Sequence, residues 1–114
     1  MQPILQIKVA RDFSSTPGPR YRIEGDNSGE EFRDEYLVPL LRKAIDEKSK
    51  VEIDLDGTEG FATSFLEESF GGLIRHRFFD YESVISTISI VSNEEPYLQE
   101  DIEFYLKDAN KSLS

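Results

Sequence analysis

Residues Val51–His76 read VEIDLDGTEGFATSFLEESFGGLIRH and contain the clearest strand and helix patterns of the chain. Its first residues alternate apolar and acidic side chains, which is typical of a half-buried strand. A loop follows as far as Ala62, and an amphipathic helix begins at Thr63 and Ser64. The pattern therefore predicts a strand that leads to the amino-terminal end of a helix, where backbone N–H groups attract anions.

The helix that follows has an apolar stripe at helical spacing, made of Phe65, Leu66, Ser69, Phe70, Leu73 and Ile74. Gly71 and Gly72 each lower helix stability by about 1 kcal/mol relative to Ala, so we expect them to permit close approach to another backbone. His76 lies between two arginines at the helix end, where cations complement the helix dipole. It lies about three turns from Ser64, which excludes a serine-hydrolase triad.

On the amino-terminal side, the chain predicts two strands and one helix. Ile4–Val9 alternates well enough for a half-buried strand. Tyr21–Glu24 predicts a second strand after a loop rich in Pro and Gly, and a hairpin is the simplest connection. Ser28 and Glu31 then stand in capping-box positions before a helical pattern. Pro39 should kink this helix or divide it, because proline lacks the amide donor.

On the carboxyl-terminal side, β-branched residues predict a strand within Ser83–Ser92, centred on Thr87–Val91. Pro96 suits the first turn of a last helix. The predicted order is β-β-α-β-α-β-α, an α/β fold in which helices pack on a small mixed sheet. Since the chain shows no repeat, linker or low-complexity tract, we expect residues 1–114 to form a single domain.

Composition restricts the classes of function. The 114 residues carry a net charge of −10, and the resulting field repels nucleic-acid phosphates and anionic membranes, so we expect neither as a partner. The absence of Cys and the single His leave no thiolate chemistry and disfavour a zinc site, and we expect no metal and no cofactor. No signal-peptide pattern and no apolar run of about 20 residues is present, so we expect a cytoplasmic protein.

Thr63 and Ser64 are the first candidates for a functional role. Ser64 and Glu67 form a second capping-box pattern, which by itself accounts for the serine. The functional alternative is phosphorylation, because a phosphate on either hydroxyl would meet helix N–H groups and the positive end of the helix dipole. The two roles are compatible.

Asp54, Asp56 and Glu59 form an acidic group beside these hydroxyls. A solvated strand end and loop accounts for them in so acidic a chain. One alternative is that they help a partner kinase to bring Mg²⁺ to the site or repel a phosphate after transfer. Another is that they are the acid–base residues of a hydrolase. No nucleophile–base pair accompanies them, and the glycines fit neither nucleotide-binding motif. We therefore predict that the protein is not an enzyme.

Three ordered motifs resemble the STAS-like family: SGEEFR at Ser28–Arg33, IDLDG at Ile53–Gly57, and TSFLEESFGGLIR at Thr63–Arg75. The similarity extends from about Gly25 to Val91. It implies the fold of the anti-sigma factor antagonists. In those proteins a strand leads to an Asp-Ser-Ser-Gly-type motif that holds a regulatory phosphoserine at a helix start.

Aligned without gaps on this motif, Ser64 takes the place of the phosphoserine and Thr63 the place of the preceding hydroxyl. Ala62 stands where the motif has an acidic residue, and Phe65 where it has glycine. Relatives are often encoded beside histidine-kinase-like (GHKL) ATPases, so the resemblance implies such an ATPase as the candidate partner.

The sequence thus predicts a non-catalytic regulatory module, similar to an anti-sigma factor antagonist, that binds a GHKL-type ATPase or another regulator. The predicted partner-binding residues are Asp54, Asp56, Gly57, Glu59, Thr63, Ser64 and Glu67. The alternative that the resemblance also implies is a module that binds a small ligand or nucleotide near the same loop. The oligomeric state stays open.

Overall fold

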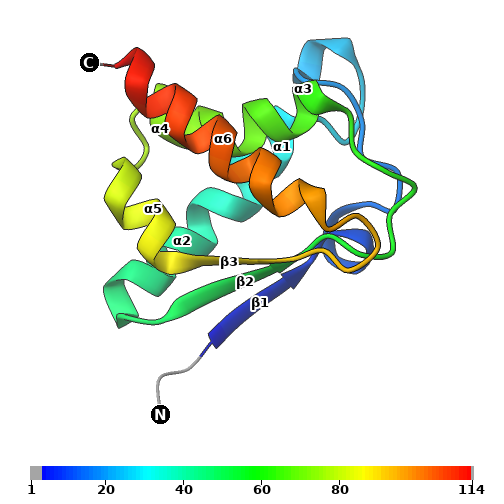
Figure 1. The fold of residues 1–114 in the computed structure, drawn as a ribbon. Coiled ribbons are helices and arrows are strands. Elements are labelled where there is room, and N and C mark those ends of the chain that lie inside the picture. The colour runs from blue at the N-terminus through cyan, green and yellow to red at the C-terminus, as the bar shows by residue number, and fades with distance from the viewer. Residues whose placement is uncertain (1–3, 114) are drawn as a thin grey trace.

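The computed structural model describes residues 4–113. Three strands form one parallel sheet in the order β1-β2-β3, and the helices lie over one of its faces (Figure 1). The strands are β1 (Ile4–Lys8), β2 (Lys50–Asp54) and β3 (Ile88–Val91). The helical segments are η1 (Val9–Phe13), η2 (Arg22–Glu24), α1 (Gly29–Phe32), η3 (Arg33–Leu37), α2 (Val38–Glu47), α3 (Thr63–Leu66), η4 (Glu67–Gly71), α4 (Gly72–Arg75), α5 (Tyr81–Thr87) and α6 (Tyr97–Ser112).

The central strand β2 separates the core from the open face of the sheet. Val51 and Ile53 are fully buried beneath the helices, whereas the alternate residues of β2 are partly exposed. This alternation is the period of two expected of a strand with one covered face. On the open face, the amide of Gln6 donates to the carboxylate of Glu52 across the β1–β2 pair, at 2.6 Å. The predicted strand at 51–55 is therefore confirmed.

The predicted hairpin is wrong. Tyr21–Glu24 is an exposed single turn containing η2, in which the Glu24 amide donates to the Tyr21 carbonyl at 3.0 Å. The Glu24 carboxylate in turn accepts the Tyr21 amide at 3.0 Å. These local bonds occupy the backbone groups that a strand would offer. The sheet is consequently parallel rather than mixed, with long crossovers in place of a hairpin.

The first long helical run has three parts, α1, η3 and α2. Ser28 caps it as predicted, and its hydroxyl accepts the Glu31 amide at 3.0 Å. Pro39 lies in the first turn of α2, directly after the wider π-helical turn η3. The predicted division near Pro39 therefore takes the form of a π-helical turn, which fits a residue that cannot donate to the regular ladder.

The β-branched run before residue 92 splits into two elements. Strand β3 lies at the predicted centre, but α5 precedes it where the sequence analysis expected strand. Asp80 caps α5, since its carboxylate accepts the Ser83 amide at 2.7 Å. This cap favours a short helix over the β preference of the side chains.

The second long run, α3-η4-α4, packs against α1 and α6. Its predicted apolar stripe is buried throughout. Phe65 stacks on Phe32 of α1, with ring centroids 5.8 Å apart. A Cβ at Gly71 would lie 2.7 Å from the Glu67 carboxylate, and one at Gly72 would lie 2.7 Å from the Arg33 guanidinium. The two glycines therefore leave room for charged side chains rather than for the expected close approach of a backbone. Within residues 4–113, no helix is both long enough and apolar enough to cross a bilayer.

Candidate functional site

The loop over residues 56–62 leaves the carboxyl end of β2 and leads into α3. In a parallel sheet the carboxyl ends of neighbouring strands lie at the same edge, so this loop meets the segment after β3. Asp56 accepts the Glu94 amide at 2.9 Å and the side-chain amide of Asn93 at 3.1 Å. The carboxylate of Glu94 accepts the Gly57 amide at 2.6 Å. These bonds tie the base of the loop to the segment after β3.

Two of the predicted acidic residues stabilise this loop. Asp54 accepts the Asp56 amide at 2.9 Å, which turns the chain out of β2. The backbone hydrogen bond from Glu94 lowers the pKa of Asp56 below its ordinary value, against a smaller opposing effect of burial. Asp56 therefore stays ionised at neutral pH and is poorly suited to act as a general acid.

The tip of the loop presents an unpaired carboxylate. Glu59 is exposed, and its backbone amide donates to the Ser15 carbonyl at 2.8 Å. Within residues 4–113, the Glu59 side chain has neither an ion-pair nor a hydrogen-bond partner. Gly60 follows with φ at +126°, a conformation that favours glycine. The loop is thus held at its base while its tip carries a free negative charge.

The start of α3 corrects the predicted capping box at Ser64 and Glu67. The N-cap is Ala62, which has extended backbone angles and provides no capping side chain. The Ala62 carbonyl accepts the Phe65 amide at 3.1 Å, so Ser64 already lies inside the first turn. Within the described chain, the amides of Thr63 and Ser64 have no acceptor. The helix therefore begins with unpaired donors.

The two candidate hydroxyls differ in environment. Thr63 is exposed, whereas Ser64 is half-buried. Thr63 also lies beside Tyr105 on α6. Burial raises the pKa of the Tyr105 phenol, and the Thr63 side chain opposes this only partly. The phenol accordingly stays protonated at neutral pH beside the helix start.

Glu67, also predicted to bind a partner, is engaged within the chain. Its carboxylate pairs with Arg20 at 2.5 Å and with Arg75 at 2.6 Å. Burial acts to raise the pKa of Glu67, but the hydrogen bonds from Arg75 and Arg20 outweigh it and lower this pKa. Glu67 is therefore less available to a partner than Glu59.

The neighbouring residue, Glu68, was missed by the sequence analysis. It is 1% exposed and pairs with Arg33, with Arg75 at 3.0 Å and with Arg20 at 3.2 Å. His76 lies 3.3 Å from the same carboxylate. We call these residues, with Glu67, the arginine–glutamate cluster. The sequence does contain an indication that Glu68 is buried, because it follows the apolar Phe65 by three residues and so lies on the same side of the helix.

The structure thus places the predicted residues in four locations. Asp54, Asp56 and Gly57 form the base of the loop, Glu59 lies at its tip, and Thr63 and Ser64 lie at the helix start. Glu67 belongs to the arginine–glutamate cluster. Among the side chains of residues 4–113, no group of three or more His, Cys, Asp or Glu is placed to hold a metal ion.

Residues 28–98 match the family model of the STAS-like domain of unknown function, DUF4325. The chain belongs to this family. The match to the STAS-like domain contains β2, the loop, both hydroxyls and β3, and it ends as α6 begins. Arg20 and Tyr105, which contact the site from either side, lie outside the matched part. No curated protein and no solved structure matches the chain.

Proposed function

We propose that this STAS-like domain is a non-catalytic regulatory module that binds a partner protein through residues 56–64. The observation that carries the proposal is the uncapped start of α3, where the amides of Thr63 and Ser64 are unpaired within the described chain. Unpaired amides at a helix start attract an anion. That anion is either a phosphate on one of the two hydroxyls or a carboxylate of the partner.

The charge of the surface favours a partner with a basic contact region. Glu59 presents a free carboxylate at the loop tip, and the whole chain carries a net charge of −10. Opposite charge on the partner would accelerate association and orient the two proteins. The family resemblance supplies the candidate, a GHKL-type ATPase.

Phosphorylation of Thr63 or Ser64 would switch this surface. The family resemblance aligns Ser64 with the phosphoserine of anti-sigma factor antagonists, whereas Thr63 is the more exposed hydroxyl. A phosphate adds a charge of about −1.5 to −2, and the helix amides and dipole stabilise it at this end. On Thr63 the phosphate would also lie beside the phenol of Tyr105. The added charge and the occupied helix amides would change what this surface offers to the partner.

The first test measures binding and modification together. The purified protein is titrated with a GHKL-type ATPase by calorimetry, and its intact mass is measured after incubation with the ATPase and Mg-ATP. We expect binding, weakened by Glu59→Lys, and addition of one phosphate, abolished in the Thr63→Ala/Ser64→Ala double variant. Glu47→Lys, an exposed charge reversal on α2, and Ser89→Ala, an exposed hydroxyl on β3, are the matched controls.

The two parts of the proposal fail separately. An unmodified mass, together with unchanged binding by Ser64→Asp, removes the phosphorylation switch and leaves partner binding in place. Absence of binding to the ATPase, or equal weakening by Glu59→Lys and Glu47→Lys, removes the assignment of residues 56–64 as the contact surface.

A nucleotide-binding module is the second candidate, because unpaired amides at a helix start also suit a nucleotide phosphate. The free carboxylate of Glu59 and the ionised Asp56 oppose it by repelling that phosphate. A thermal-shift screen with nucleotides distinguishes the two functions. Stabilisation by a nucleotide, enhanced by Glu59→Gln, would favour this candidate over the protein-binding module.

A further inference from the structure

Strand β3 leaves one edge of the sheet open. It pairs with β2 on one side, and within residues 4–113 no strand pairs with its other side. The Val91 carbonyl accepts the Leu55 amide at 2.8 Å, so the backbone groups of Val91 face the β2 side. Because these groups alternate in direction along a strand, those of Ile90 face the open edge. Ile90 therefore offers a donor and an acceptor to an added strand.

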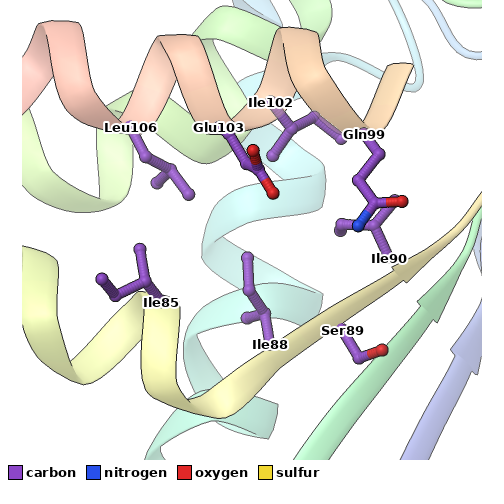
Figure 2. Close-up of a pocket in the computed structure, with 8 residues that line it drawn as sticks. All are labelled: Ile85, Ile88, Ser89, Ile90, Gln99, Ile102, Glu103 and Leu106. Atoms are coloured by element: carbon purple, nitrogen blue, oxygen red, sulfur yellow. The ribbon is translucent and has the colours of Figure 1, made fainter. Parts of the chain in front are cut away.

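A groove of about 190 Å³ lies between this strand and α6, and it is lined by five aliphatic side chains together with Ser89, Gln99 and Glu103. Figure 2 shows the side chains of Ile88 from β3 and Ile102 and Leu106 from α6 directed into it, with Ile85 of α5 at one end. Ile85 is 40% exposed. The groove thus runs beside the open edge and continues the apolar face of the sheet.

The two edges of the sheet differ in protection. Native edges are commonly blocked by charged residues, prolines or irregular turns. Strand β1 carries Lys8 and passes directly into the π-helical turn η1, whereas β3 reads Ile-Ser-Ile-Val and has neither charge nor proline. Only the shortness of β3 limits pairing on its side.

We propose that the β3 edge and its groove bind an extended basic segment of a partner protein by strand addition. The backbone of the segment pairs with Ile90, and alternate apolar side chains enter the groove. Glu103 lies on the α6 wall of the groove, with an exposed carboxylate that suits a Lys or Arg of the segment. A second copy of this chain fits poorly, because it brings another net charge of −10. This surface is separate from residues 56–64 and does not depend on their proposed role.

The probe is a synthetic peptide of alternating Lys and Val with blocked ends, titrated into the ¹⁵N-labelled full-length protein. We expect chemical-shift changes concentrated at residues 85–92 and 99–106, with slower hydrogen exchange at the Ile90 amide. An analogue N-methylated at every second residue cannot complete the ladder and should bind about tenfold more weakly. An alternating Glu and Val peptide should not bind, because Glu103 repels it.

Matched variants distinguish peptide binding in the groove from general attraction by charge or hydrophobicity. Glu103→Lys should weaken the Lys-Val peptide about tenfold, whereas Asp108→Lys, also exposed on α6 but outside the groove, should not. Ile85→Gln should weaken it several-fold, whereas Ile45→Gln should not, although Ile45 is similarly exposed at 37%. All four residues are exposed, so their replacement leaves the core intact.

Four results would overturn the proposal. One is equal binding by a peptide of the same composition with its Val residues clustered. Another is a set of chemical-shift changes that maps away from β3 and α6. Absence of binding at millimolar peptide would also overturn the proposal. The fourth is self-association of the free protein that protects the Ile90 amide, which would assign the edge to a second copy of the chain.

Discussion

Glu68 and Arg33 form an ion pair that is almost wholly removed from solvent, with 2% and 6% of their side chains exposed. Glu68 lies on η4 and Arg33 on η3, so the pair joins the two long helical runs. The Arg33 guanidinium also lies 5.3 Å from the ring centroid of Phe78. Arg20 reaches the same carboxylate from the segment before α1, which anchors that segment to the helices.

Glu68→Gln is expected to lower the free energy of unfolding by about 3 kcal/mol, because it removes the buried counter-charge of Arg33. The guanidinium then keeps only its ion pair with the partly exposed Asp34, at 2.8 Å. Urea unfolding followed by circular dichroism measures the change. The control is Glu35→Gln, which breaks the exposed pair with Arg22 and should cost less than about 1 kcal/mol. Equal losses in the two variants would contradict the structural importance of the buried pair.

Acid should weaken the fold in part through Glu67. Its pKa is lowered in the folded protein, so its contribution to stability is complete above the ordinary value of 4.5 and is lost as the pH falls below it. Unfolding free energies measured from pH 7 down to pH 3 should show this decline. Both Glu67→Gln and Arg75→Gln should flatten it, since each removes one side of the interaction. If the unfolding free energy of both variants depends on pH as steeply as that of the wild type, the Glu67–Arg75 ion pair does not contribute to acid sensitivity.

Substitutions at the two helix starts should change the free energy of unfolding in opposite directions. Ser28→Ala should lower the unfolding free energy by about 1 kcal/mol because it removes a cap, whereas Ser64→Ala should change it by no more than a few tenths. Ala62→Asp should raise it by about 1 kcal/mol, since it supplies the missing cap at the start of α3. Urea unfolding of the three variants measures these changes. A loss at Ser64 as large as that at Ser28 would restore Ser64 as the cap.

Gly29→Ala separates packing from helix propensity. Propensity alone would stabilise α1 by about 1 kcal/mol. The added Cβ would instead lie 2.5 Å from the backbone oxygen of Phe65, so the two helical runs must move apart. We expect a net loss of about 1–3 kcal/mol from this overpacking. A thermal melt above that of the wild type would show that α1 and α3 are less tightly packed.

Local residue patterns were enough to predict several elements of the fold. Alternation in β2 located the central strand, and helical spacing after Thr63 located the buried stripe. Ser28 and Glu31 marked a helix start that the structure confirms. The hydroxyls at Thr63 and Ser64 were also correctly placed after β2. In each case one short segment contains all the information, since a strand or helix with one buried face repeats with its own period.

Contacts between distant segments selected which of the local patterns formed the predicted element. Tyr21–Glu24 alternates like a strand, yet no neighbouring strand meets it and a local turn forms instead. Glu68 is acidic, yet it is buried because Arg33 and Arg20 reach it from 35 and 48 residues away. The open edge of β3 likewise depends on the order of strands in the sheet. A sequence pattern records which face of an element is apolar, whereas the partners of that face are set by how the whole chain packs.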